Sequence, residues 1–78
     1  MELLVYTKDN CPYCAKVKAF LKENNVEYKE LNIKEPQIAA ELFEKTDQKG
    51  VPVIEADEGI VIGFNKPALM KLLGLQQG

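Results

Sequence analysis

The chain has 78 residues, 46% of them hydrophobic and 28% charged, which is typical of a single soluble domain covering residues 1–78. Its formal net charge of −2 gives no electrostatic basis for binding nucleic acid or an anionic membrane. No apolar run approaches the roughly 18 residues that a membrane span needs, and the first residues lack a signal-peptide pattern. We therefore expect a cytoplasmic, monomeric protein.

The first half of the chain alternates between strand and helix patterns. The apolar run LLVYT at residues 3–7 predicts a buried central strand. Pro12 suits the first turn of a helix, which continues with apolar residues at helical spacing as far as Asn24. Residues 26–33 then alternate apolar and polar side chains, with an irregularity near the middle, and predict a second strand. The intervening helical crossover predicts that the two strands are parallel.

A second helix and a loop follow. Pro36 is expected to begin the helix, which ends near Thr46, and residues 48–50 are expected to form the loop. One face of this helix is apolar, and it carries Ile38, Ala39, Leu42 and Phe43. We expect this face to pack on the sheet.

The last third of the chain predicts a hairpin and a helix. Residues 51–54 and 60–62 are short β-branched runs, separated by the turn signal Asp-Glu-Gly at residues 57–59. Pro67 is expected to start the final helix and Gly74 to cap its end. The resulting order βαβαββα predicts an α/β fold, in which one four-stranded mixed sheet is flanked by three helices.

The only two cysteines, Cys11 and Cys14, stand at the start of the first predicted helix. Residues three apart on a helix share a face, with Cβ atoms roughly 5–6 Å apart, so a small adjustment would allow a disulfide. A helix N-terminus stabilises a thiolate. We therefore expect Cys11, at or beside the N-cap, to attack a substrate disulfide and the more buried Cys14 to resolve the mixed disulfide. Lys8 and Lys16 could add positive charge.

Three other roles for the cysteine pair can be compared with redox exchange. A structural disulfide would close only a tiny loop and would constrain the unfolded chain little. A mononuclear zinc site needs about four ligands, and the chain has no histidine and no second cysteine pair. An iron–sulfur cluster shared by two chains, with Cys11 as a ligand, remains an alternative from a different functional class.

The motif CPYC between a strand and a helix, with Val51-Pro52 ahead of a hairpin, resembles the glutaredoxins, which have the thioredoxin fold. The resemblance covers the chain from Leu3 to about Leu73. It implies a thiol–disulfide oxidoreductase without a bound cofactor, which uses glutathione as electron donor. It also implies that Lys8 meets a glutathione carboxylate and that the backbone of Val51, before a cis-proline, pairs with an extended substrate. Tyr13 is expected to lie exposed beside the sulfurs.

The chain departs from the glutaredoxin pattern at two places, of which the smaller is Gly50 where that family usually has a threonine before Val51-Pro52. The glutathione site of that family usually ends in two glycines, a small polar residue and an aspartate, whereas this chain has Gly63-Phe64-Asn65-Lys66-Pro67. The sequence Gly-Phe-x-x-Pro resembles instead the NrdH-type redoxins, which donate electrons to ribonucleotide reductase and are recharged by thioredoxin reductase. We expect Gly63 and Phe64 to frame the substrate groove with Val51 and Pro52. The sequence leaves the donor open between glutathione and thioredoxin reductase, and the substrate between a protein disulfide and a glutathione mixed disulfide.

Overall fold

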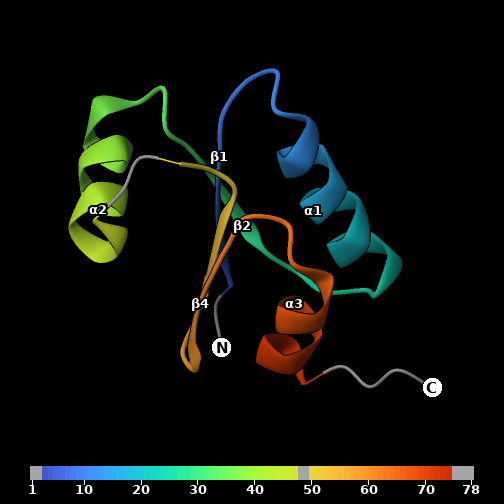
Figure 1. Ribbon diagram of the computed structural model, residues 1–78. Helices are drawn as coiled ribbons and strands as arrows, with labels where there is room; N and C mark the ends of the chain where they lie inside the picture. Colours follow the sequence, from blue (N-terminus) through green and yellow to red (C-terminus); the bar gives the residue numbers. More distant parts are fainter. Residues whose placement is uncertain (1–2, 48–49, 75–78) are drawn as a thin grey trace.

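The computed structural model describes residues 3–47 and 50–74, and its elements follow the predicted order βαβαββα (Figure 1). Their bounds are β1 Leu4–Thr7, α1 Pro12–Glu23, β2 Lys29–Asn32, α2 Pro36–Thr46, β3 Val53–Ala56, β4 Gly59–Ile62 and α3 Lys66–Leu73. The predicted loop at residues 48–50 lies mostly outside the described residues. Among the described helices, none is long and apolar enough to cross a membrane.

The four strands form one mixed sheet in the order β2-β1-β3-β4. Strand β1 pairs with β2 in parallel, as the helical crossover predicted, and with β3 in antiparallel register. In that register Tyr6, near the end of β1, lies opposite Val53, the first residue of β3. The loop that leaves β1 and the loop that enters β3 therefore emerge at the same end of the sheet.

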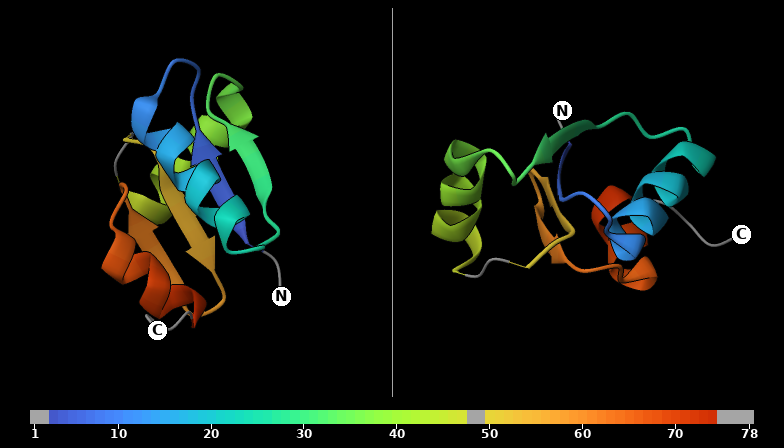
Figure 2. Two further views of the ribbon diagram at one scale, coloured as in Figure 1. Left: turned by 90° about the vertical axis from the view of Figure 1, so that its right-hand side faces the viewer. Right: turned by 90° about the horizontal axis from the view of Figure 1, so that it is seen from above.

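Helices cover both faces of the sheet, with α1 and α3 on one side and α2 on the other (Figure 2). The core is correspondingly divided into two clusters, which the strands separate. The cluster under α1 and α3 contains Leu3, Val5, Val17, Phe20, Leu21, Ile54, Val61 and Leu69. The cluster under α2 contains Tyr6, Leu42 and Val53. The predicted three-layer α/β architecture is confirmed.

Local capping explains where the last helix begins and ends. The Asn65 side chain accepts a hydrogen bond from the Ala68 N–H at 3.2 Å, as an N-cap residue does. Helix α3 consequently starts at Lys66, one residue before the predicted Pro67. Gly74 caps its end with a left-handed φ of 71°, as predicted.

Two strands differ from their predicted bounds by more than one residue. The second was predicted over residues 26–33 but spans only Lys29–Asn32. Asn25 has a left-handed φ of 57°, and the Val26 N–H still bonds the Leu21 carbonyl at 2.9 Å, so this segment completes the helix end. The third strand begins at Val53 rather than at Val51, after the cis Val51-Pro52 peptide.

The expectation that Phe43 of α2 packs on the sheet was wrong. Leu42 faces the sheet and is 1% exposed, whereas Phe43 is 45% exposed. Adjacent helical residues are separated by about 100° around the axis, so a helix that points Leu42 at the sheet turns Phe43 aside. Phe43 lines a shallow apolar hollow on α2 instead, together with Ile33 and Ala39.

Candidate active site

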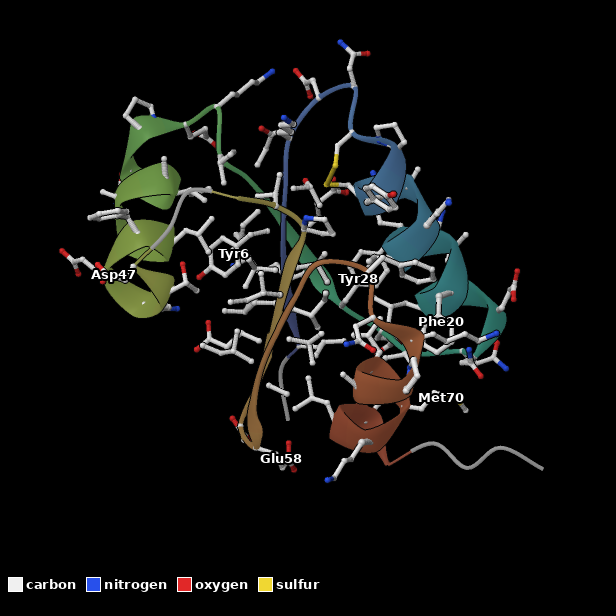
Figure 3. All side chains as sticks on the ribbon, in the orientation of Figure 1. Tyr6, Phe20, Tyr28, Asp47, Glu58 and Met70 are labelled. Carbon is white, nitrogen blue, oxygen red and sulfur yellow. A yellow bond between two sulfur atoms is a disulfide. The ribbon has the colours of Figure 1, made fainter. Side chains whose placement is uncertain are left out.

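Both cysteines lie where the loop after β1 enters α1, and they are joined as a disulfide (Figure 3). Their Cα atoms are 5.2 Å apart. The Cys14 side chain is buried, with 1% exposure, whereas Cys11 is only partly buried. The Cys11 sulfur is therefore the more accessible of the two, in agreement with the sequence prediction.

Cys11 is the N-cap of α1, and its sulfur acts as the capping atom. The backbone N–H of Cys14 donates to the Cys11 Sγ at 3.1 Å, and the N–H of Ala15 donates to the Cys11 carbonyl at 3.1 Å. The unpaired N–H groups of a helix start carry partial positive charge. A negative charge on the Cys11 sulfur would be stabilised by the same geometry.

The loop before β3 reaches the same end of the sheet. The Val51-Pro52 peptide is cis, and the Pro52 carbonyl accepts a hydrogen bond from the Gly63 N–H at 2.7 Å. This bond connects the residue that follows β4 to the residue that precedes β3. Among the described residues, no backbone group forms a hydrogen bond with the N–H or the carbonyl of Val51.

The remaining predicted binding residues have different surroundings. Tyr13 is 58% exposed beside the sulfurs, and the Lys16 Nζ lies 5.1 Å from the centre of its ring. Lys8 is exposed and lines a hollow that both cysteines share. Phe64 is partly buried, and its ring packs edge-to-face on Phe20 with a centroid distance of 6.4 Å. Phe64 thus contributes to the core under α1 and α3.

A polar pocket beside the disulfide contains residues that were not predicted from the sequence. It is lined by Lys8, Asp9, Asn10, Cys11, Cys14, Ala15, Lys18, Glu30 and Asn32. Within it the Lys18 Nζ donates to the Glu30 Oε2 at 3.2 Å. The fully buried hydroxyl of Thr7 donates to the same oxygen at 2.7 Å. One carboxylate oxygen therefore links β1, β2 and α1 in the pocket that both cysteines line.

These contacts keep Glu30 ionised. The hydrogen bond from Thr7 is the largest cause that lowers the pKa of the carboxyl group below its usual range, and the hydrogen bond and charge of Lys18 lower it further. Desolvation opposes this shift. At neutral pH the pocket thus holds a carboxylate beside the two cysteines.

Part of this arrangement has a signal in the sequence. Lys18 follows Cys14 by four residues, so helical spacing places the two on one face of α1. Sequence reasoning assigned the positive charge to Lys8 and Lys16 instead, and Lys16 lies over Tyr13. Glu30 could not be found in this way, because its position depends on the register that sets Val5 opposite Glu30 in the β1–β2 pair.

Comparisons with known proteins place this site in a family. Residues 3–61 match the family model described as Glutaredoxin. A glutaredoxin-like 8.6 kDa protein from the rubredoxin operon of Clostridium pasteurianum is 36% identical over 70 residues, 88% of this chain and 93% of that protein. The glutaredoxin-like protein NrdH of Lactococcus lactis is 35% identical over 68 residues, 87% of this chain and 94% of that protein.

A solved structure agrees with these relatives. The crystal structure of the thioredoxin-like protein BC3987 is 36% identical and superposes with a TM-score of 0.84 over 91% of this chain and 99% of that one. The fold is therefore thioredoxin-like, and the paired cysteines stand where a dithiol redox centre requires them. The chain belongs to the glutaredoxin family and is a dithiol thiol–disulfide oxidoreductase.

Proposed function

We propose that Cys11 is the attacking sulfur and Cys14 the resolving sulfur of this oxidoreductase. The observation that carries this assignment is the Cys14 N–H that donates to the Cys11 Sγ at the start of α1, together with the burial of Cys14. A thiolate held by a helix N-terminus is stabilised at neutral pH. The assignment gives the two sulfurs distinct roles.

The reaction then runs in two exchanges. The Cys11 thiolate attacks a substrate disulfide and forms a mixed disulfide, and the other substrate sulfur leaves as a thiolate. Cys14 releases its proton to solvent and attacks the Cys11 sulfur. The second substrate sulfur leaves as a thiolate, and the protein is left with the Cys11–Cys14 disulfide. Two electrons pass from the cysteines to the substrate, and no bound cofactor is needed.

The substrate lies, in this proposal, along the groove between the cysteine loop and the cis-proline loop. The backbone of Val51 pairs with an extended chain, while Tyr13 covers the reacting sulfurs and Lys8 meets an acidic group of the ligand. Pro52 and Gly63 fix the other side of the groove through their hydrogen bond. Phe64 supports that side by its packing on Phe20.

We propose that a thioredoxin reductase recharges the protein. The segment Gly63 to Lys66 lacks the second glycine and the aspartate expected for the γ-glutamyl end of glutathione. The similarity to the glutaredoxin-like protein NrdH of Lactococcus lactis, together with the NrdH-like Gly-Phe-x-x-Pro segment, supports this donor. The CPYC motif and Lys8 favour glutathione as the alternative donor. A monomeric protein in a reducing cytoplasm suits either donor.

Trapping tests the roles of the sulfurs. A Cys14→Ser variant mixed with a disulfide substrate should accumulate a mixed disulfide at Cys11, which mass spectrometry of digested protein would locate. Cys11→Ser is the matched control and should accumulate far less. Equal trapping by the two variants would show that the assigned roles are wrong.

A competition between donors tests the recharging step. Oxidised protein would be offered thioredoxin reductase with NADPH, and separately glutathione with glutathione reductase and NADPH. We expect NADPH consumption to be faster with thioredoxin reductase, and faster turnover with glutathione would overturn the proposed donor. Anaerobic purification beforehand should yield a colourless monomer, whereas a brown dimer would support the iron–sulfur alternative.

A further inference from the structure

The side of the protein that carries the cysteines is basic, although the whole chain has a formal net charge of −2. Helices α1 and α3 cover this side of the sheet (Figure 2). Neither helix has an acidic residue in its first turn, where the helix dipole would favour one. Their one acidic residue is Glu23, the last residue of α1. The lysines of the two helices are Lys16, Lys18, Lys22, Lys66 and Lys71.

The opposite side of the sheet, covered by α2, is acidic. The one lysine of α2, Lys45, is already in an ion pair. The acidic residues of α2 and of its two caps are Glu35, Glu41, Glu44 and Asp47. The protein therefore has a basic side and an acidic side. Since α1 begins at the cysteines, the redox centre belongs to the basic side, and a charge separation of this kind orients an approaching charged partner.

Two of the lysines, Lys16 and Lys66, lie along a line that starts at the cysteines. The Lys16 Nζ lies 5.1 Å from the ring centre of Tyr13, which follows Cys11 by two residues. Phe20 continues the same side of α1 at helical spacing, and the Lys66 Nζ lies 5.9 Å from its ring centre. We refer to Tyr13, Lys16, Phe20 and Lys66 as the basic strip. Both lysines are exposed, and neither forms an ion pair with a described residue.

The basic strip borders the groove that we propose for the substrate. The Phe64 ring packs on Phe20 at a centroid distance of 6.4 Å. Phe64 follows Gly63, whose N–H donates to the Pro52 carbonyl at 2.7 Å. Printed contacts therefore connect the strip to the cis-proline side of the groove, while Tyr13 connects it to the cysteine side. A chain bound in the groove passes beside the two lysines.

Acidic groups near the cysteines do not cancel the charge of the strip. Asp9 lies 3.9 Å from the Lys34 Nζ, and Glu30 lies 3.2 Å from the Lys18 Nζ. Each of these carboxylates already has a lysine of its own. The ammonium groups of the strip are therefore left to attract an acidic ligand.

Helix geometry gives the spacing that such a ligand needs. An α-helix rises about 1.5 Å per residue, so Lys16 lies about 7–8 Å along the axis from Cys11, and Phe20 lies about 13–14 Å along it. An extended chain advances about 3.3 Å per residue. The positions of Lys16 and of Lys66, which lies over Phe20, therefore correspond to about two and four residues from the attacked cysteine of a substrate.

We propose that the basic strip binds an acidic segment of the protein substrate, with aspartate or glutamate about two and four residues from the cysteine that is attacked. The inference rests on the proposed function, and it narrows the substrate from protein disulfides in general to those flanked by acidic residues. Complementary charges speed the encounter and fix the orientation of the bound chain. The exchange itself is unchanged, and two electrons still pass from Cys11 and Cys14 to the substrate disulfide.

The test uses synthetic peptides with one internal disulfide and two variable positions, two and four residues from it. The variable residues are both glutamate, both glutamine or both lysine, and each form is made with these positions ahead of the disulfide and behind it. Protein reduced with dithiothreitol and then desalted is mixed with each peptide, and chromatography of acid-quenched samples gives the rate constant. In at least one placement, the glutamate form should react about fivefold faster than the glutamine form at low salt, and the lysine form more slowly than either.

The readout is the ratio of the glutamate rate to the glutamine rate, because this ratio cancels any effect of a substitution on the Cys11 thiolate. Lys16→Gln and Lys66→Gln should each lower the ratio about twofold, and high salt should bring the wild-type ratio towards one. Lys29→Gln is the matched control and should leave the ratio unchanged. Lys29 is exposed at the start of β2, at the end of the sheet opposite the cysteine loop.

A ratio of one for the wild type in both placements would overturn the inference, and so would a ratio that either strip variant leaves at the wild-type value. If one variant does not fold, the other decides. A glutathionylated form of the glutamine peptide is a further comparison. If the strip variants slow its reduction as strongly, relative to the internal disulfide, the lysines serve glutathione and the inference is wrong. Equal rates for all peptides overturn this inference alone, whereas reduction of none of them refutes the proposed function.

Discussion

The backbone N–H of Cys14 points at the sulfur of Cys11 and donates to it at 3.1 Å, so the two active-site residues are linked through the helix start as well as through their disulfide. Because this N–H is one of the unpaired donors of α1, it remains available to a thiolate after reduction. In the mechanism proposed above, this N–H stabilises the Cys11 thiolate, in a chain without histidine.

The first prediction concerns that thiolate. The pKa of Cys11 in the reduced protein should lie below about 7.5, against about 8.5 for a free thiol, because the helix N-terminus favours the charged form. The absorbance of the thiolate at 240 nm against pH, measured in a Cys14→Ser variant, reports this value. A titration midpoint at or above the free value would refute activation by the helix.

A second prediction separates packing from binding at Phe64. Its ring packs on Phe20, so Phe64→Ala should lower the free energy of unfolding by about 2 kcal/mol. Phe43→Ala, at an exposed position, is the control and should cost about 0.5 kcal/mol or less. Urea unfolding of the oxidised proteins measures both values. Unchanged stability of Phe64→Ala combined with lost turnover would identify the ring as a substrate contact instead.

A third prediction concerns the attachment of α2 to the sheet. The Lys45 Nζ donates to the Glu55 Oε1 at 2.8 Å and to the hydroxyl of the fully buried Tyr6 at 2.9 Å. Tyr6 lies on the α2 side of the sheet in Figure 3. A double-mutant cycle of Lys45→Met and Tyr6→Phe should give a coupling of about 1 kcal/mol. Strictly additive single-variant effects would show that the contact adds nothing to stability.

The Lys45 contacts also set a pH dependence. The hydrogen bond to Glu55, and then the one to Tyr6, raise the pKa of Lys45 above its usual range. A lysine whose pKa is higher in the folded protein contributes stability below its pKa in the unfolded chain, about 10.4. That contribution is lost as the pH rises through its pKa in the folded protein. The difference in stability between the wild type and Lys45→Met should therefore persist at neutral pH and shrink only at strongly alkaline pH.

A fourth prediction applies at acid pH. The pKa of Glu30 is lowered, first by the Thr7 hydrogen bond, so the ionised carboxylate contributes stability above the unfolded value of about 4.3. That contribution is lost as the pH falls through the lowered pKa. Because the Glu30 side chain is 39% exposed, we expect less than about 1 kcal/mol. The wild type should lose more stability than Glu30→Gln between pH 6 and pH 3 in urea unfolding, and parallel losses would contradict the linkage.

Much of this protein could be predicted from local sequence. Pro12 and Pro36 mark helix starts, Gly74 marks a helix end, and the order of apolar patterns gives the element sequence and the parallel β1–β2 pair. The spacing of Cys11 and Cys14 fixes a dithiol at a helix start, since a helix start is a local feature with local chemistry. Short-range geometry was enough for these conclusions.

The errors occurred where a residue's environment depends on distant parts of the chain. Residues 26–33 were predicted as one strand despite an irregular alternation, but Val26 and Tyr28 pack under α1 and α3, while Leu31 packs under α2. The sequence pattern places Phe43 on the apolar face of its helix. The rotation of α2 is set instead by Leu42 and Lys45, which lie against the sheet. The spacing of apolar residues along the sequence does not by itself predict which face of the sheet a side chain packs against.

The sequence by itself determined the reactive pair, because two thiols three residues apart at a helix start have few other uses. Only the tertiary structure decided what surrounds them. Glu30 meets Thr7 because β1 and β2 pair in a particular register, and Lys18 reaches the same carboxylate because α1 packs across those strands. The cysteine pair is a local feature of the chain, whereas the charged side chains that line its pocket, Lys18 and Glu30, are distant in the sequence and are brought together only by folding.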